Sequence, residues 1–472
     1  PGAIVGFFMA QWISRALVAQ LSVDAERMVL DPSFDWRVMA FTTVVAFLTA
    51  FVCGIVPALR AARVAPLDVL KVRTRALTAS SGRRALASLS GGLVITQVTL
   101  SLALVIAAAL FVRSFARLSN VPLGFDPDRV LVVNVDTGRV RTERADRGRL
   151  YQRIVEAAAG VPGVAQAGGS IWTPVDGGLR LGDPQSRITF NFVTPGWFAA
   201  YGTALRAGRD FTIQDTAEAP PVVIVNEAFV RTFMPGRSPI GEMVPHPRSR
   251  GRELQRTIVG VVADTIFETQ RDGIQRIVYV PVAQSAATGP GELTEISVGV
   301  RPHAGPPMQL AGAVGAALRR VDPNLSFSFQ LLTDHVQASV RQERLVAVLS
   351  GFFGALALTI AAMGLYAVTS YSVSRRVVEI GIRRALGAPA LDVLGLVVGQ
   401  SMILTAVGIA LGLMAAAAGT RYLRAMLFGL TPLDPTTFVG VAVLFACVAV
   451  AASSIAALRA VSIDPMVAVR TE

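Results

Sequence analysis

Few residues in this sequence are of a type and spacing that could carry out chemistry. The only lysine, Lys71, follows Val69-Leu70 and precedes Val72-Arg73. A phosphate-binding P-loop needs a glycine-rich run that ends in Lys followed by Ser or Thr, because its backbone amides and its lysine hold the phosphates together. No such run surrounds Lys71, so this sequence has no P-loop with which to hydrolyse ATP.

The three histidines, His246, His303 and His335, lie far apart in the sequence. None belongs to an H-E-x-x-H motif or to a Cys/His metal spacing, and no Gly-x-Ser-x-Gly elbow occurs. We therefore expect histidines that are solvated or packed in turns, with no catalytic, cofactor or metal site and no enzyme activity. Finding His246 or His335 beside a carboxylate in a deep outer pocket would revive the alternative of a membrane-anchored enzyme.

A charged segment near the C-terminal end is more informative. Arg375, Glu379 and Arg383 are four residues apart, so they share one helix face and can form ion pairs. Gly387 and Pro389 then end the predicted helix. The pattern alone favours an ordinary positively charged cytoplasmic loop, and the alternative is an amphipathic helix presented to a cytoplasmic partner. The candidate contact residues are Arg375, Arg376, Glu379, Arg383, Arg384 and Gly387.

The elements that must position this segment are apolar spans. The chain has 472 residues, of which 52% are hydrophobic and 16% charged, whereas soluble domains average about 25% charged. Five uncharged runs are long enough to cross a bilayer at roughly 20 residues each, and a shorter one begins the chain at 1–14. The five runs are 38–59, 92–112, 345–374, 393–420 and 436–458.

The distribution of charge sets the predicted topology. Of the net charge of +12, nine units lie in residues 60–91 and 373–390, two short stretches beside apolar spans. Short basic loops lie on the cytoplasmic side, so this charge indicates membrane topology and not nucleic-acid binding. The acidic loop 21–35 then lies outside, whereas Arg113 and Arg117 fall on the outer side against the rule. Cys53 and Cys447 lie within spans, so no disulfide framework is expected.

A repeated unit indicates two membrane modules. Residues 58–71 and 457–470 both begin Ala-Leu-Arg-Ala and continue to a proline, and each copy follows an apolar run. The pairs Asp31-Pro32 and Asp434-Pro435 both precede the last span of their module. We expect residues 1–71 to be the last two spans of a truncated first module, and residues 72–91 to be a cytoplasmic linker.

Residues 113–344 read as a soluble domain that alternates between strand-like and helix-like patterns. Asn226 is a predicted helix cap, and a helix from Asp334 is predicted to continue without a break into the span that begins at residue 345. The predicted strands are 129–136, 222–225, 258–262, 277–280 and 295–300, and the predicted helices are 147–159, 227–231 and 308–320.

Particular motifs across the chain resemble those of FtsX-like and MacB-like ABC transporter permeases. Glu379-Ile-Gly-Ile-Arg-Arg-Ala-Leu-Gly-Ala388 is similar to the family's signature between two closing spans. The outer domain carries further motifs that resemble the MacB-type periplasmic core, and two modules in one chain are similar to the duplicated orphan permeases of acidobacteria. These motifs begin at Gly124 (GFDPDRVL), Thr194 (TPGWF), Gly208 (GRDF), Val225 (VNEAF), Ser238 (SPIGE), Ile258 (IVGVV) and Val278 (VYVPV), and the closing span begins with Phe428 (FGLTPLDP).

The resemblance implies a multi-pass α-helical membrane protein with a large α+β extracytoplasmic domain, built as a porter-like βαβ part with an inserted subdomain near 200–285. It implies a second module made of the span 92–112, the periplasmic core domain 113–344 and the three-span permease domain 345–472. It also implies that 375–388 is a coupling helix resting on a separate cytoplasmic ABC ATPase, with no cofactor in the permease itself.

On this basis the chain is expected to be a permease subunit for export or mechanotransmission in a bacterial inner membrane. It would have a periplasmic adaptor or effector as a further partner, and the two modules would form a pseudo-dimer in the full-length chain. The alternative is a non-transport scaffold or signal relay that controls a periplasmic effector such as a cell-wall hydrolase.

Overall fold

A computed structural model describes residues 89–143, 146–181, 187–247, 253–287, 294–374, 389–431 and 433–461, together with a few helical positions between Ala40 and Phe51. The chain divides into two units, Pro1–Arg84 and Ala85–Glu472. The spans predicted at 1–14 and 38–59 lie almost wholly outside the described residues, as does most of the linker 72–91, so the truncated first module stays a prediction.

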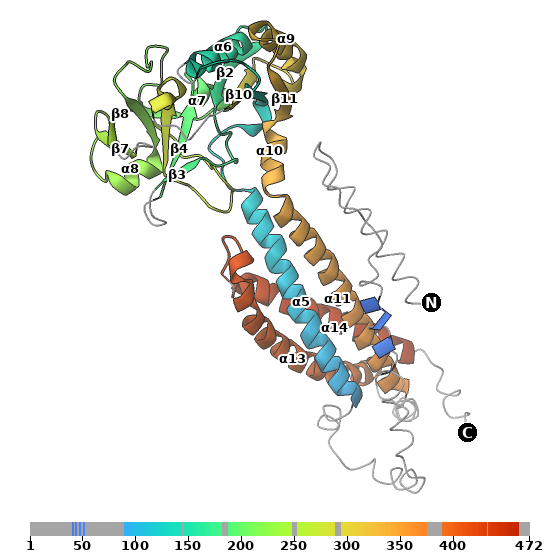
Figure 1. Cartoon of the computed structure of the whole chain (residues 1–472). Coiled ribbons are helices and arrows are strands. Elements are labelled where there is room, and N and C mark those ends of the chain that lie inside the picture. The colour runs from blue at the N-terminus through green and yellow to red at the C-terminus, as the bar shows by residue number, and fades with distance from the viewer. Residues whose placement is uncertain are drawn as a thin grey trace. The chain divides into compact units, whose positions relative to one another are not determined.

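Four long apolar helices make up the membrane part of the second unit (Figure 1). They are α5 (Leu89–Ser119), α11 (Arg341–Ser374), α13 (Ala390–Leu423) and α14 (Pro435–Val461). Each contains a stretch long and apolar enough to cross a bilayer, and each coincides with one of the last four spans predicted from the sequence.

Small residues let these helices approach closely around α5. A Cβ added at Gly408 of α13 would lie 2.8 Å from Val98, and one added at Gly412 would lie 2.7 Å from the side chain of Leu102. The two glycines are four residues apart and so share one face of α13, the arrangement that lets membrane helices pack backbone against side chain. Leu102, Ile106 and Leu110 are consequently fully buried within the bundle.

The outer domain is built on one mixed sheet whose order is β11-β1-β10-β2-β4-β9-β6-β8-β5, with β3 paired to β4 and β7 to β8. Two split βαβ units form what we call the porter half: β1 (Leu131–Asp136), α6 (Arg147–Ala159) and β2 (Val164–Ser170), then β10 (Glu295–Pro302), α9 (Ala311–Val321) and β11 (Ser326–Leu331). All pairings within this half are antiparallel.

The chain between β2 and β10 forms what we call the inserted half. It consists of β3 (Leu179–Leu181), β4 (Ile188–Val193), α7 (Trp197–Tyr201), β5 (Leu205–Gly208), β6 (Val222–Asn226), α8 (Glu227–Phe233), β7 (Met243–Pro247), β8 (Glu253–Val262) and β9 (Ile277–Pro281). The expected insertion near 200–285 is therefore present but longer. Only one residue pair, Ser170 with Val193, joins β2 to β4 where the halves meet.

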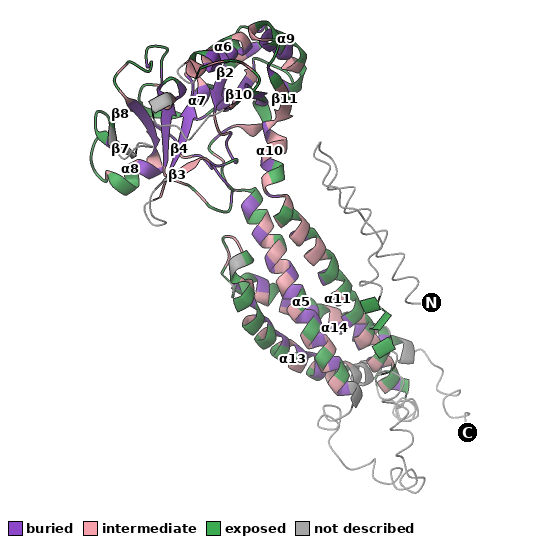
Figure 2. Ribbon diagram, viewed as in Figure 1, coloured by how far each residue is buried: buried purple, intermediate pink, exposed green. Residues whose placement is uncertain are grey.

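Alternation along the strands gives the sheet two apolar faces (Figure 2). Leu131, Val133 and Val135 of β1 point into a cluster covered by α6 and α9. Val130 and Val132 point the other way, into a cluster with α7 and with α10 (Leu332–Ser339). Strand residues alternate between faces with a period of two, so the β-branched run in β1 supplies both clusters.

One prediction about the helices was wrong. The chain does not run as one helix from Asp334 into the membrane span, because α10 ends at Ser339 and α11 starts at Arg341. Val340 stands between them with φ −114° and ψ 13°, outside the helical range. No glycine or proline lies at the break, so the sequence pattern predicts a continuous helix there.

Candidate functional site

The predicted contact residues Arg375, Arg376, Glu379, Arg383, Arg384 and Gly387 lie outside the described residues. On either side the structure describes α11 up to Ser374 and α13 from Ala390, with Pro389 immediately before it in an extended conformation. Pro389 therefore precedes the next helix as its sequence position suggested, and the coupling-helix assignment remains a prediction.

The histidines are held by structural contacts. His335 on α10 lies 2.7 Å, Nε2 to Oδ1, from Asp176 in the loop after β2, and nearly half of the Asp176 side chain is exposed. The backbone of His303 donates to Gly163, and His246 pairs with Leu254 in the sheet. Within the described part of the chain no group of three His, Cys, Asp or Glu could hold a metal ion. The His335–Asp176 pair is thus a partly exposed contact.

A polar cluster ties the outer end of α5 to the start of α14. The guanidinium of Arg113 contacts the Asp434 carboxylate and the Thr436 hydroxyl, and it donates to the Thr437 hydroxyl at 2.7 Å. Asp434 also accepts from the backbone N–H of Thr437 at 3.0 Å, as a helix N-cap does. Hydrogen bonds from Thr437 and Thr436 hold the pKa of Asp434 below its usual range, against the effect of burial.

Two further contacts of α5 reach the hairpin between α13 and α14. The Arg117 guanidinium donates to the carbonyl of Gly429, and the hydroxyl of Ser114 accepts from the backbone N–H of Phe428 at 2.7 Å. Arg113 and Arg117 are one helical turn apart, so they face the hairpin together. Arg113 and Arg117 fall on the outer side of the membrane in the predicted topology, against the rule that basic residues lie inside. Both are therefore engaged in contacts between helices.

Sequence reasoning missed this cluster. Arg113 and Asp434 were each placed at the outer end of a span, but pairing them required knowing which helices are neighbours. The available signal was the combination of an unexpected outer arginine with an acidic residue before the last span.

A loop of the inserted half connects the domain to both long helices that lead into it. In the β8–β9 loop (residues 263–276) the backbone N–H of Ile266 donates to Leu123, four residues beyond the end of α5, at 2.9 Å. Arg271 in the same loop pairs with Glu343 in the first turn of α11 at 3.7 Å. A small cavity of about 40 Å³ lies beside this pair and is lined also by Phe115 and Phe428. Movement of either helix end would therefore act on this loop.

The same loop is clamped within the domain. Glu268 is buried and pairs with Arg180 of β3. The carbonyl of Phe267 accepts from the backbone N–H groups of Val175 and Gly177 at 3.1 and 3.0 Å. These bonds hold Val175 at φ +75°, a value that a β-branched residue rarely adopts. The loop is thus bonded both to its own half and to the ends of the long helices.

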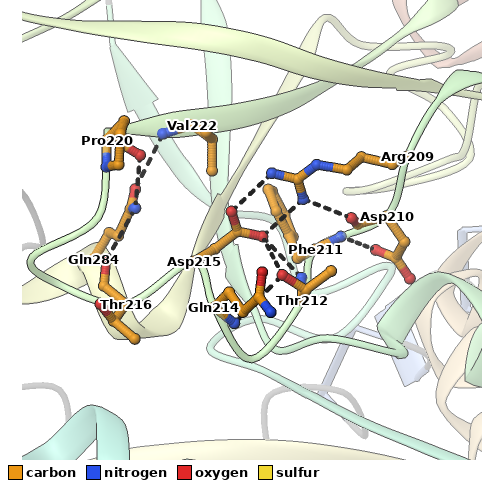
Figure 3. A network of polar contacts seen from close by, with 10 residues as sticks. All are labelled: Arg209, Asp210, Phe211, Thr212, Gln214, Asp215, Thr216, Pro220, Val222 and Gln284. Carbon is orange, nitrogen blue, oxygen red and sulfur yellow. Dashed lines mark hydrogen bonds and ion pairs between the residues drawn. The ribbon is translucent and has the colours of Figure 1, made fainter.

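The motif Gly208-Arg-Asp-Phe organises the segment that follows β5 (Figure 3). Arg209 donates two hydrogen bonds to the Asp215 carboxylate, at 2.8 and 2.9 Å, and Thr212 donates to the same carboxylate through its backbone N–H and its hydroxyl. Burial alone would raise the pKa of Asp215, but the bonds from Arg209 and Thr212 outweigh it and lower that pKa. Gln284 closes the same segment by bonding Thr216, Pro220 and Val222.

Other motif residues have equally structural roles. The Thr194 hydroxyl accepts from the backbone of Gly169 at 2.8 Å, and Trp197 is fully buried against Tyr201 and Tyr279. Asn226 caps α8 through Phe229, as predicted. The described motifs that carried the resemblance in the outer domain therefore contribute to its fold.

The described architecture is that of a multi-pass membrane permease with a mixed α+β extracytoplasmic domain inserted after the first span of its module. Residues 92–311 match the family model of the MacB-like periplasmic core domain, and residues 351–465 match that of the FtsX-like permease C-terminal domain. The chain belongs to the FtsX-like and MacB-like ABC transporter permeases and is the permease component of an ABC-type system.

Individual relatives are distant. The chain is 23% identical over 322 residues to the uncharacterized ABC transporter permease YknZ of Bacillus subtilis (strain 168), covering 67% of this chain and 78% of that protein. It is 26% identical over 344 residues to the macrolide export ATP-binding/permease protein MacB of Bradyrhizobium diazoefficiens, covering 71% of this chain and 50% of that protein. The chain thus spans only half the length of that ATP-binding relative.

Solved structures of outer domains also match. The periplasmic region of MacB from Actinobacillus actinomycetemcomitans matches with a TM-score of 0.31 and 14% identity, covering 47% of this chain and 97% of that one. The extracellular domain of a YknZ transporter from Gram-positive bacteria matches with a TM-score of 0.28 and 16% identity, covering 42% and 99%.

Proposed function

We propose that this permease is driven by a separate cytoplasmic ABC ATPase, and that it converts ATP hydrolysis into movement of its outer domain for export or mechanotransmission. The chain itself then has no enzymatic activity. One observation carries the proposal: the β8–β9 loop joins the inserted half both to the segment after α5, through Ile266 and Leu123, and to the start of α11, through Arg271 and Glu343. Movement of α5 and α11 relative to each other would therefore change the conformation of the outer domain.

The ATPase contact in this proposal is the coupling helix at 375–388. Its basic face is supplied by Arg375, Arg376, Arg383 and Arg384, with Glu379 inside the helix and Gly387 at its end. It follows α11 directly in the sequence, so a push on this segment acts on the same helix that carries Glu343 in its first turn. The domain limits follow the sequence interpretation, with the periplasmic core at 113–344 and the three-span permease domain at 345–472.

The cellular setting belongs to the same proposal. The protein resides in the inner membrane of a bacterium with its outer domain in the periplasm, where a periplasmic adaptor or effector is its further partner. A second module in the full-length chain completes a pseudo-dimer.

The test is a charge reversal in the coupling helix. The double variant Arg383→Glu/Arg384→Glu should lose co-purification with the ATPase and should still insert into the membrane. The matched control Arg83→Glu/Arg84→Glu makes the same charge change in the predicted linker and should keep the ATPase. Retention of the ATPase by the first variant would show that the coupling assignment is wrong. Co-purification of a cell-wall hydrolase with the ATPase would favour the signal relay over export.

A further inference from the structure

The helices α10 and α11, which follow one another where the outer domain meets the membrane part, are held in different ways (Figure 1). Leu332 and Val336 of α10 are buried in the apolar cluster that α7 shares, and the backbone N–H of Leu332 donates to the carbonyl of Val130 at 3.1 Å. His335 adds a contact of 2.7 Å with Asp176. Apolar burial and polar contacts together therefore fix α10 to the outer domain.

The first turn of α11 is held more loosely. Among the described residues, the side chains of 341–344 make one polar contact with the outer domain, that of Glu343 with Arg271 of the β8–β9 loop. The nitrogen and oxygen atoms lie 3.7 Å apart, beyond hydrogen-bond distance, and both side chains are partly exposed. Water screens such a pair, so the pair is weak and opens at little cost in free energy.

Unfilled space lies beside this contact. A cavity of about 40 Å³ is lined by Arg271 and Glu343, by Gln342 and Val346 of α11, and by Phe428 of the hairpin between α13 and α14. Its volume exceeds the roughly 10–15 Å³ that one water molecule requires. Close-packed neighbours normally hold a side chain in place, so the Glu343 carboxylate has room to move away from Arg271.

The backbone between the two helices supplies freedom of movement. Val340 has φ −114° and ψ 13°, and it stands between the last residue of α10, Ser339, and the first residue of α11, Arg341. Rotation about these two dihedrals changes the angle between the helices without breaking the hydrogen bonds inside either one. The loosely held first turn of α11 therefore directly follows a point at which the chain can bend or turn.

We propose that the Arg271–Glu343 pair is a latch on a hinge at Val340. While the latch is closed, α11 keeps its orientation relative to α10. When the latch opens, α11 turns or tilts at Val340 while the His335–Asp176 contact keeps α10 with the outer domain. The force that opens the latch is a push transmitted along α11, and in this respect the inference rests on the proposed function.

The test uses the purified full chain in nanodiscs without nucleotide or ATPase, in a Cys53→Ala/Cys447→Ala background. Nitroxide labels are placed on cysteines introduced at two exposed positions, Ala313 on α9 and Val348 on α11. Double electron–electron resonance then gives the distribution of distances between the labels. A second pair, Ala313 with the exposed Gln337 on α10, reports on the outer domain without crossing the hinge.

The variant Glu343→Gln removes one charge of the latch. The population of 313–348 distances outside the main peak should rise about two- to fivefold, the range that loss of a partly exposed ion pair allows, and the 313–337 distances should not change. The matched control is Glu227→Gln, which removes one charge of the Arg206–Glu227 pair. That pair is 3.6 Å apart, is also partly exposed and lies in the inserted half, so the control should change neither distribution.

Ionic strength gives a second measurement on the unaltered pair. Raising NaCl from about 0.05 to 0.5 M screens the two charges, so the wild-type 313–348 distribution should broaden and that of Glu343→Gln should not. The latch is disproved if Glu343→Gln leaves the 313–348 distances unchanged, or if the control changes them equally. An equal change in the 313–337 distances would disprove the hinge at Val340. No ATPase is present, so these results are separate from the test of the coupling helix.

Discussion

The guanidinium of Arg113 contacts the carboxylate of Asp434 across 321 residues of chain, and so joins the first helix of the module to the last. The same carboxylate caps α14 through the backbone of Thr437. One aspartate therefore both starts a helix and holds it against α5.

Removing either partner should loosen this junction. Arg113→Ala and Asp434→Ala should each lower the thermal stability of the detergent-solubilised protein. Their double-mutant cycle should give a coupling energy of about 1 kcal/mol, because hydrogen bonds to charged groups are worth about 1.5–3 kcal/mol and solvent screening of the partly exposed Arg113 side chain reduces this value. The control cycle is the exposed pair Asp146–Arg149, three residues apart at the start of α6, which should couple by no more than about 0.5 kcal/mol. Equal coupling in the two cycles would mean that the junction contributes no more than a surface pair.

The glycines of α13 should tolerate no large side chain where they meet α5. Gly408→Leu or Gly412→Leu should destabilise the protein by about 1–3 kcal/mol, because the new side chain would enter space held by Val98 or Leu102. Gly419→Leu in the same helix is the control, since nothing lies within 4 Å of its added Cβ. Thermal unfolding followed by loss of helical circular dichroism measures the difference. A similar loss from all three variants would instead indicate a general effect of leucine in this helix.

No other residue should be tolerated at position Gly208. Its φ is +75°, and an added Cβ would lie 2.2 Å from the carbonyl oxygen of Val259. Gly208→Ala should therefore cost at least about 2 kcal/mol. Gly236→Ala has nearly the same φ, +74°, but open space around the added atom, so it should cost only about 1 kcal/mol. Tryptophan fluorescence, to which the buried Trp197 and Trp172 of this half contribute, follows the unfolding. Equal losses of stability in the two variants would show that backbone strain alone sets the cost of the substitution.

Lowering the pH should destabilise the segment that follows β5, because Asp215 becomes protonated. Its pKa is lowered in the folded protein, so the stability from the Arg209–Asp215 contact is present above the ordinary pKa of about 4 and is lost as the pH falls below it. Amide hydrogen exchange at Thr212, whose backbone N–H donates to Asp215, should speed up between about pH 5 and 3, after correction for intrinsic rates, by more than in neighbouring strands. Asp215→Asn should exchange faster at neutral pH and should lose this pH dependence. An unchanged dependence in that variant would assign it to another group.

The sequence was most informative where a pattern is long. Uncharged runs of about 20 residues predicted the four described spans, because only a helix satisfies its own backbone in a bilayer. The strand predicted at 222–225, which is observed at 222–226, and the cap at Asn226 were predicted for a similar local reason. Motif residues such as Gly208 and Trp197 identified the outer domain because its fold needs them.

Features that depend on tertiary neighbours could not be predicted. Strand β2 reads Val-Ala-Gln-Ala-Gly-Gly-Ser and has only one strong strand-forming residue, Val164. Gly168 is nevertheless required there, since an added Cβ would lie 2.4 Å from the backbone of Trp197. The contact between Arg113 and Asp434 depends on helix packing in the same way. The break at Val340 has no local signal at all. The coupling helix stays a prediction.

That break determines what kind of motion α11 can pass on. A continuous helix would carry both a twist about its axis and a thrust along it into the outer domain. At Val340 two backbone dihedrals interrupt the helical hydrogen bonding, so a twist can be absorbed there, whereas a thrust still presses on α10 and on the β8–β9 loop through Glu343. We therefore expect this connection to pass on thrust along α11 and to absorb rotation about its axis.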